Sequence, residues 1–226
     1  MEKKLRHKYV SVRYGSLVSY GGNQRQASGK LLRRCGCGVV AAADLLIYLS
    51  AHETDLPPLL ERSENIPASE YNALLKELQT HYLPLIPHFG LSGWLMALGL
   101  NRFFRRKHWP LRAFWGVCPG RLQRCIAQML SRDIPVILAV GPNLPLFWRR
   151  KSLTLYKKTP AGNYRPAGNT CAHYVTITAA GDQWLQVSSW GQAYYIRWQD
   201  FQHYVEQHSN YFASNILYLR PKRFLF

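Results

Sequence analysis

The hydrophobic positions in the first half of the chain follow helical patterns. Residues 38–49 are apolar at almost every position, which is typical of a helix buried in the middle of a domain, and this helix should begin at Cys37. Ser69 precedes a run of apolar residues at helical spacing and is the expected N-cap of a second helix. Two more helices are predicted, over 92–104 and from Pro119 onward, because proline suits the first helical turn.

The second half of the chain changes to a strand-like pattern. Residues 134–140 are β-branched and apolar, as in a central strand, and Pro135 stands only at the start of this run. In the first half, residues 9–20 alternate as an early strand would, and a polar loop with glycines follows over 21–30. Further strands are predicted over 173–178, 184–189, 194–198 and 215–219, with a short helix over 200–207 between the last two.

This order of elements predicts an α+β fold. A helical half, about residues 21–131, should pack face to face on an antiparallel sheet half, about residues 132–226 together with the N-terminal strand. A chain of 226 residues without internal repeats fits a single domain over 1–226. Functional sites commonly lie where two such halves meet, so the seam between them is the place to look for one.

Composition and charge narrow the class of protein. The chain is 47% hydrophobic and carries 29 Lys and Arg against 12 Asp and Glu, a net charge of +17. Such a chain folds, and its charge attracts acidic partners. No apolar run reaches the roughly 20 residues of a membrane span, so we expect neither a signal peptide nor a transmembrane segment. Five cysteines are an odd number, which favours a reducing, cytoplasmic compartment.

The segment Cys35-Gly36-Cys37-Gly38 is the most informative one for chemistry, because it leads directly into the predicted buried helix. A cysteine at a helix N-terminus lies near unpaired backbone N–H groups and the positive end of the helix dipole, which lower the pKa of its thiol. The glycines leave its sulfur accessible to a substrate. The alternative is that the cysteine simply packs in the core, as cysteines often do.

Two later segments could complete a catalytic site. His173 stands at the head of a predicted strand, from which its imidazole can face a cysteine on an opposing helix as nucleophile and base. After a turn at Gly181-Asp182, the next strand ends in Ser188-Ser189-Trp190-Gly191. A single strand histidine is more often an ordinary hydrogen-bonded one, so the order of all three segments carries the argument.

That order, and Cys37-Gly38-Val39-Val40-Ala41 at the start of a helix, resembles the papain-like cysteine peptidase superfamily. The nearest branch is that of compact bacterial peptidases similar to the domains that process bacteriocin leaders ending in double glycine. The resemblance covers roughly residues 20–49 and 173–198. It implies a papain-like α+β fold and a cysteine peptidase, or a related amide-cleaving acyl transferase, that acts on a peptide or amide substrate.

The resemblance also implies roles for single residues. Cys37 would be the nucleophile and His173 the general base and later general acid. Ser188 stands where the family has the Asn or Asp that orients the histidine, and Gln24, with Gln26 in reserve, is the candidate for binding the oxyanion. The remaining pocket candidates flank these positions: Cys35, Gly36, Gly38, Ser189 and Trp190.

This chain departs from the family pattern at two positions. The family's glutamine stands about six residues before the cysteine, where this chain has Leu31, so Gln24 can serve only if residues 25–34 loop out. Ser188 lacks the charge of a carboxylate and stabilises an imidazolium less. An alternative function is therefore a catalytically impaired binding or scaffold protein with the same fold. The positive charge suggests a substrate with acidic character.

The residues raise two other possible functions, metal binding and contact with nucleic acid or a membrane. Zinc sites usually separate paired cysteines by two to four residues, which neither Cys35-x-Cys37 nor the Cys118 and Cys125 positions satisfy, so we expect no metal and no cofactor. Basic clusters interleaved with aromatic residues could contact nucleic acid or, as a peripheral contact, an anionic membrane. No nucleic-acid-binding motif accompanies them, which disfavours nucleic acid. The clusters are 102–107, with Phe103 and Phe104, and 149–151, after Phe147 and Trp148.

Overall fold

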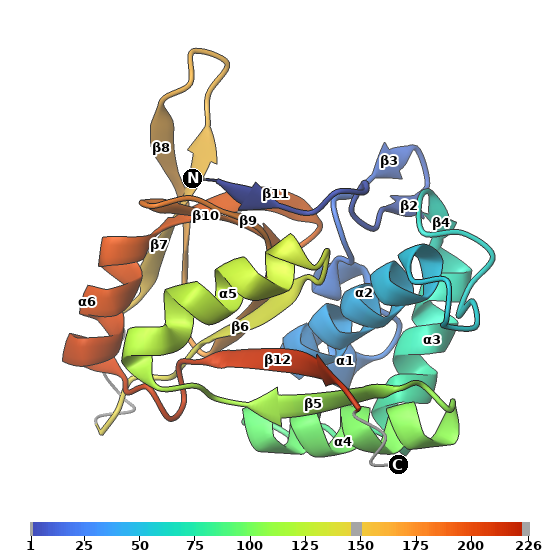
Figure 1. Cartoon of the computed structure of the whole chain (residues 1–226). Coiled ribbons are helices and arrows are strands. Elements are labelled where there is room, and N and C mark those ends of the chain that lie inside the picture. The colour runs from blue at the N-terminus through green and yellow to red at the C-terminus, as the bar shows by residue number, and fades with distance from the viewer. Residues whose placement is uncertain (1, 146–150, 223–226) are drawn as a thin grey trace.

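The computed structural model describes residues 2–145 and 151–222 and contains one large antiparallel sheet (Figure 1). Short β1 pairs with β9 and lies off the main strand order. The α+β class predicted from the sequence is confirmed. The strands, in sheet order, are β5 (Leu111–Trp115), β12 (Ile216–Pro221), β6 (Val136–Val140), β9 (His173–Ala180), β10 (Trp184–Ser189), β11 (Gln192–Arg197), β7 (Leu153–Lys158) and β8 (Tyr164–Thr170), with β1 (Lys3–Lys4) beside β9.

The helices pack against different parts of this sheet. Helix α2 contacts β9, β6 and α3, helix α4 contacts β5, and α5 contacts β9, β12 and β1. Helix α6 lies against β11 and β7. The helices are α1 (Lys30–Cys35), α2 (Cys37–His52), α3 (Ala68–His81), α4 (Gly93–Arg106), α5 (Leu122–Ser131) and α6 (Trp198–His208), with 3-10 turns η1 (Gln24–Gln26) and η2 (Pro119–Arg121).

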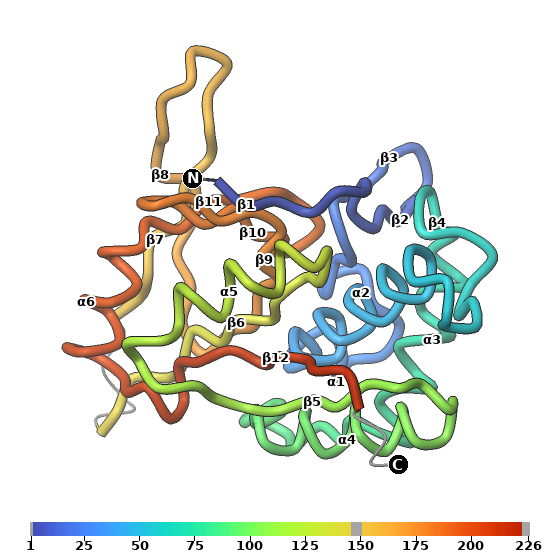
Figure 2. Tube along the Cα trace, in the orientation of Figure 1, coloured from blue at the N-terminus to red at the C-terminus, as the bar shows by residue number. Residues whose placement is uncertain are grey.

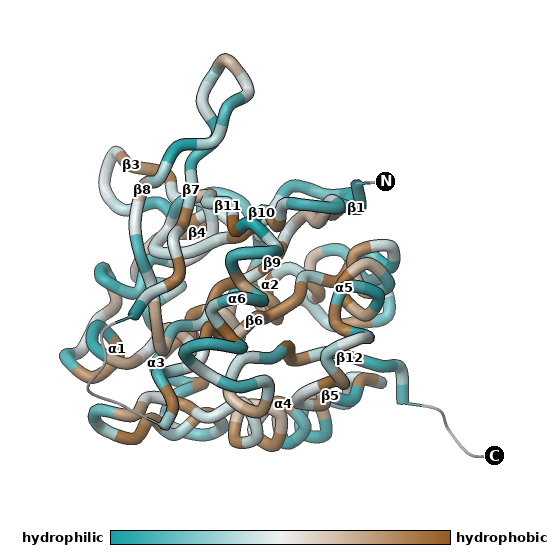
Figure 3. Tube along the Cα trace, turned by 90° about the vertical axis from the view of Figure 1, so that its left-hand side faces the viewer, coloured by the Kyte–Doolittle hydropathy of each residue, from teal (hydrophilic) through white to brown (hydrophobic). Residues whose placement is uncertain are grey.

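Helix α2 is the centre of the hydrophobic core. Residues 38–50 are all buried, so the helix has no solvent-facing side, as its sequence predicts. Asp44 is the one charged residue in this run. Figure 3 shows further hydrophobic stretches on β6 and α4. Because α2 is enclosed on all sides, its first residue, Cys37, is held at a defined position against the sheet.

Three predicted helices have other bounds in the structure. The second helix begins at Ala68 with Pro67 as its N-cap, so the expected cap at Ser69 is wrong by two positions. Pro119 opens the 3-10 turn η2, and α5 begins only at Leu122. The predicted helix over 200–207 is extended at both ends in α6. Local capping chemistry places helix ends only to within a few residues, because the neighbouring chain decides where the last turn forms.

The predicted N-terminal strand over residues 9–20 is wrong. Gly15, at φ +63°, interrupts the run, which forms the short strands β2 (Val12–Tyr14) and β3 (Leu17–Val18). These strands form a separate three-stranded sheet with β4 (Ile66–Pro67). The N-terminal strand of the main sheet is β1 instead, and its pairing with β9 depends on hydrogen bonding across a long sequence separation, which alternation cannot reveal.

The division into a helical and a sheet half holds only in part. Strand β5 comes from the predicted helical half and joins the main sheet beside β12, whereas α6 is the helix that was expected within the sheet half. The hairpin of β7 and β8, which the sequence analysis missed, extends away from the rest of the molecule (Figures 1 and 2). Within the described residues, no helix combines the length and apolarity required to cross a bilayer.

Candidate functional site

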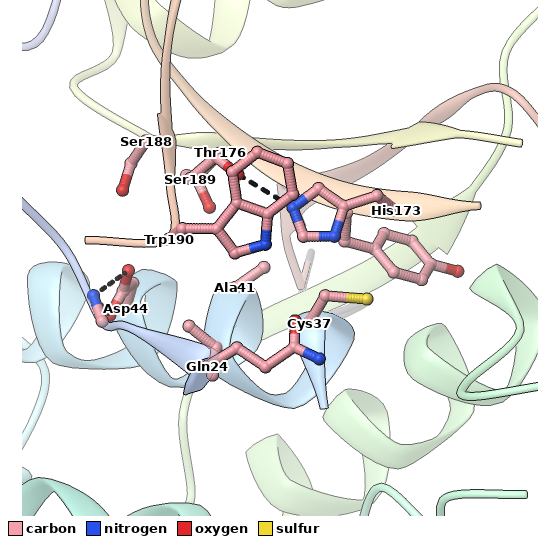
Figure 4. A pocket seen from close by; sticks show the side chains of 12 residues that line it. Gln24, Cys37, Ala41, Asp44, His173, Thr176, Ser188, Ser189 and Trp190 are labelled. Carbon is pink, nitrogen blue, oxygen red and sulfur yellow. Dashed lines mark hydrogen bonds between the residues drawn. The ribbon is translucent and has the colours of Figure 1, made fainter. Parts of the chain in front are cut away.

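Cys37 and His173, which stand 136 positions apart in the chain, line the same small buried cavity between α2 and the sheet. Cys37 is the first residue of α2 and His173 the first residue of β9. Both side chains also line a larger open groove of about 410 Å³. In Figure 4 the sulfur and the imidazole approach the same space, one from the helix and one from the sheet. Both residues therefore line one cavity at the seam between helix and sheet.

The backbone around Cys37 turns sharply between two helices. Gly36 ends α1 and also precedes the first residue of α2. A Cβ atom at Gly36 would lie 2.4 Å from the carbonyl oxygen of Leu32, so a larger residue cannot be accommodated there without movement. Gly38 is buried against Met96 and Tyr174. These two glycines therefore allow α2 to start close to the sheet.

The expected lowering of the Cys37 pKa is wrong. Burial raises the pKa of the Cys37 thiol, although backbone N–H groups of Tyr174, Gly38 and Cys37 itself act in the opposite direction. The helix terminus stabilises a thiolate, but removing a thiolate from water costs more here, so burial has the larger effect on the pKa. Before a substrate binds, Cys37 is a neutral thiol at neutral pH.

The imidazole of His173 is held on two sides. Its Nε2 lies 2.8 Å from the Oγ of Ser189, and the Trp190 indole stacks on it with ring centroids 4.6 Å apart at an angle of 20°. Burial, followed by the positive charge of Arg25, lowers the pKa of His173 to about 4. The ring is thus neutral at neutral pH.

Ser188, the expected partner of His173, does not contact the imidazole. Its hydroxyl donates to the carbonyl oxygen of Tyr20 at 2.8 Å instead. Ser188 pairs directly with Thr176 on β9, so these two side chains share one face of the sheet, while Ser189 shares the other face with His173. Successive side chains of a strand point to opposite faces of the sheet, so an error of one residue selects the wrong face. The alternation of β9 and β10 was the signal that could have identified Ser189.

Gln24 lies beside Cys37, and Gln26 does not. Gln24 is buried and lines both the small cavity and the groove. Its Nε2 donates to the carbonyl oxygen of Arg33 at 3.0 Å. The intervening residues form a short loop and α1, which is the looping out that the sequence analysis required. Gln26 is exposed and lines neither space.

Asp44, which the sequence analysis missed, lies two helical turns after Cys37 and lines the same cavity. Its carboxylate accepts hydrogen bonds from the Gly22 N–H at 2.9 and 3.1 Å and from the Tyr71 hydroxyl at 2.7 Å. The Tyr9 hydroxyl donates at 3.3 Å. Burial raises the pKa of Asp44 to about 6, although these hydrogen bonds oppose the increase. Asp44 therefore fixes the segment that leads into Gln24 (Figure 4).

Arg25 also belongs to the site without having been predicted. Its guanidinium lies over the Trp190 ring, 5.1 Å from the centroid, while the Trp190 ring itself stacks on His173. Trp190 lies between Arg25 and His173, so the positive charge of Arg25 lowers the pKa of His173 without direct contact. A lone charged residue within an apolar helix, such as Asp44, is a visible sequence signal, but nothing in the sequence pattern indicated Arg25.

The remaining cysteines show no metal or disulfide arrangement. Cys35, at the end of α1, and Cys171, just before β9, both line the groove with Cys37. All five cysteines are unpaired. Among the described residues, no group of three or more His, Cys, Asp or Glu side chains is placed to bind a metal ion.

The two aromatic rings of the first basic cluster are buried. Phe103 and Phe104 are buried in the core together with Trp109, because α4 directs this side toward β5 and its neighbours. Because both rings are buried, they are not free to stack on bases or to enter a membrane, and a contact of this cluster with nucleic acid or a membrane stays a prediction. In the second cluster, Lys151 is exposed, while the other residues, 147–150, lie outside the described part of the chain.

The groove extends the site along the surface. Two loops form its walls, residues 88–91 after α3 and residues 169–172 before β9, and Arg34 adds a positive charge. Phe89 is 84% exposed and lies along this groove. No protein-family model, curated protein or solved structure matches the chain.

Proposed function

We propose that the protein is a cysteine peptidase, or a related amide-cleaving acyl transferase, with a papain-like arrangement of its helix and sheet. The observation that carries this proposal is the joint cavity of Cys37 and His173, in which Ser189 holds Nε2 of the imidazole. A nucleophile, a base and a group that orients the base are the parts that acyl transfer requires. These three groups also follow one another along the chain in the same order as in papain-like enzymes, which supports the proposal.

In this mechanism both partners start neutral. As the Cys37 sulfur attacks the substrate carbonyl carbon, its proton passes to Nδ1 of His173. The imidazolium then gives this proton to the amine nitrogen, the C–N bond breaks, and a thioester remains on Cys37. Water, deprotonated by His173, or another amine completes hydrolysis or transfer. The pKa values favour proton transfer during attack, because neither the thiolate nor the imidazolium is stable at rest.

The oxyanion can be bound at the start of α2. The backbone N–H groups of Cys37 and Gly38 lie close to the sulfur, and Gln24 lines the same cavity. One N–H of the Gln24 amide is used by Arg33, and the second is available to donate. Donors that are already in place when charge develops stabilise the transition state strongly.

The groove indicates an extended substrate. It runs from Cys37 between the loops 88–91 and 169–172, so the substrate can continue beyond the scissile bond. Arg34 in its wall and Arg25 over Trp190 place positive charge beside the site. We therefore propose a peptide with acidic residues near the cleaved bond as the substrate.

Acylation of the protein by p-nitrophenyl acetate tests this function. This ester should transfer its acetyl group to Cys37 and release p-nitrophenolate, and mass spectrometry of the digested protein should find the acetyl thioester on Cys37. Cys35→Ala is the matched control, since Cys35 lines the same groove, and it should retain the reaction. Acetylation confined to Cys35, Cys171 or lysines would contradict the proposal.

A second function, peptide binding without cleavage, is supported by one observation. The thiol of Cys37 and the imidazole of His173 are both neutral at rest, and a serine in place of a carboxylate adds no charge to stabilise an imidazolium. A binding protein would hold peptides in the groove equally well with Cys37→Ala. It would also remain unacylated in the experiment above.

The contacts of the two serines predict a clear difference between Ser189→Ala and Ser188→Ala. Loss of the Ser189 hydroxyl frees Nε2 of His173 and should slow Cys37 acylation about 10-fold or more, since one hydrogen bond at such a site is worth about 1–2 kcal/mol. Ser188→Ala removes only a contact to the Tyr20 carbonyl and should slow it less than about threefold. Equal rates in the two variants, measured by p-nitrophenolate release, would refute the assignment of Ser189.

A further inference from the structure

A second cavity, of about 530 Å³, lies outside the candidate active site, between the end of α4, the start of β5 and the end of β12. This volume falls within the range of about 300–1,000 Å³ that is common for small-molecule sites. The elements around it are tied together, because the Lys222 N–H donates to the Pro110 carbonyl oxygen at 2.8 Å. The Asn101 side chain also bonds both backbone groups of Ala113 at 2.8 Å. The cavity is therefore a built feature of the fold.

The charged groups of this cavity have one sign. Arg105, Arg112 and Lys222 line it, and no Asp or Glu is found among the described lining residues. Arg112 is further held by its contact with the Phe114 ring, 5.1 Å from the centroid. All three side chains are exposed, and their combined positive charge, with no carboxylate beside it, attracts an anion to this cavity.

The rest of the wall is apolar. Leu98, Phe104 and Leu111 line the cavity, and Leu98 is 65% exposed at its mouth. Trp109 also forms part of the wall and is 3% exposed. Its indole Nε1 is buried and has no hydrogen-bond partner among the described residues. An unpartnered buried donor is unusual, and this one belongs to a residue in the wall of the cavity.

We propose that this cavity binds a small acidic amphiphile, a phosphate or carboxylate attached to an apolar chain. Arg105, Arg112 and Lys222 hold the acidic group, the Trp109 indole donates to it after a small local adjustment, and the apolar chain runs along Leu111 and Leu98 toward solvent. The same chemistry occurs in free amphiphiles and in the lipids of a membrane. A cationic or purely apolar ligand would leave the three positive charges uncompensated.

Decyl phosphate, below its micelle-forming concentration, is the probe for this site. Isothermal titration calorimetry should show one site, and the Trp109 indole N–H resonance, identified with Trp109→Phe, should shift downfield on binding. Decyltrimethylammonium should not bind, and inorganic phosphate should bind at least about 10-fold more weakly, because it lacks the apolar chain. Equal binding of the ammonium amphiphile would overturn the proposal.

Paired substitutions separate this site from the general positive charge of the protein. Arg105→Gln with Arg112→Gln should weaken decyl phosphate binding about 10-fold or more, because charge-assisted hydrogen bonds are lost. Arg102→Gln with Arg106→Gln is the matched control: it removes the same amount of charge, at exposed positions of α4 outside the cavity, and should change affinity less than about threefold. Equal weakening by both pairs would show a diffuse charge effect and no site.

Vesicles distinguish the two sources of the ligand. If the amphiphile comes from a membrane, phosphatidylglycerol vesicles should bind the protein more tightly than phosphatidylcholine vesicles, and only the Arg105 and Arg112 pair should reduce this binding. If it is a free compound, decyl phosphate alone should bind. If decyl phosphate does not bind, and substitution of Arg105 and Arg112 leaves vesicle binding unchanged, the proposed site is refuted. The measurement requires no enzymatic activity, so it succeeds or fails separately from the proposed peptidase.

Discussion

His173→Ala should slow acylation of Cys37 by p-nitrophenyl acetate about 10²–10⁴-fold at pH 7, the usual contribution of a general base. Burial holds the Cys37 thiol in its neutral form, so the sulfur depends on a base during attack more than a cysteine with a lowered pKa would. Added imidazole should restore part of the rate in the variant, because the substitution leaves space beside Ser189 and Trp190. A variant that reacts as fast as the parent would show that His173 is structural.

The pH dependence of this reaction has a defined direction. His173 accepts a proton only when neutral, and its pKa is about 4, so the acylation rate should fall about tenfold per pH unit below pH 4. The lowered pKa also means that His173 contributes stability above its unfolded pKa of about 6.5 that is lost as the pH falls through 4. Circular dichroism at each pH must therefore confirm that the protein is still folded. A half-maximal rate near pH 6.5 would contradict a buried imidazole.

Asp44→Ala should lower the free energy of unfolding by about 3–5 kcal/mol. The change leaves the Gly22 N–H and the hydroxyls of Tyr71 and Tyr9 without their acceptor inside the core, at about 1–3 kcal/mol for each buried unpaired group. It should also slow Cys37 acylation, because the segment before Gln24 loses its attachment to α2. Urea unfolding measures the first effect, and Asp44→Asn is the matched control that retains an acceptor oxygen.

The same carboxyl predicts how stability changes with pH. Because burial raises the folded pKa of Asp44 to about 6, its favourable contribution is complete below the unfolded pKa of about 4 and is lost as the pH rises through 6. A difference of about two pKa units corresponds to about 3 kcal/mol. The unfolding free energy of the parent relative to Asp44→Asn should fall by this amount between pH 4 and pH 7. A constant difference would show that folding does not raise the pKa of Asp44.

The helices were largely predictable because local patterns determine them. Residues 38–49 are apolar on all sides, and such a run has few alternatives to a buried helix. The strand over 184–189 was also predicted with its observed bounds. In contrast, β7 and β8 carry exposed polar positions and form a hairpin that extends from the body of the molecule. Their sequences therefore lack the run of apolar residues that identifies a buried strand.

The candidate site was predictable to the level of two side chains and their order along the chain. The glycine-flanked Cys37 before a buried helix and His173 at the start of a strand were recognised from local chemistry. The sequence did not predict the roles of Ser189, Asp44 and Arg25, because each role depends on which residues face that side chain in the folded protein. Ser188 was chosen over its neighbour because a linear motif does not state which face of a strand a residue occupies.

The sequence by itself determined that the chain folds as α+β, that α2 is buried on all sides, and that Cys37 stands at its start. These properties follow from short-range periodicity and from the glycines around the cysteine. The tertiary structure alone decided which serine contacts His173, and that Cys37 and His173 are both neutral at rest. The physical reason is that strand register and desolvation depend on the packing of segments far apart in the chain, and neither can be read from residues that are adjacent in sequence.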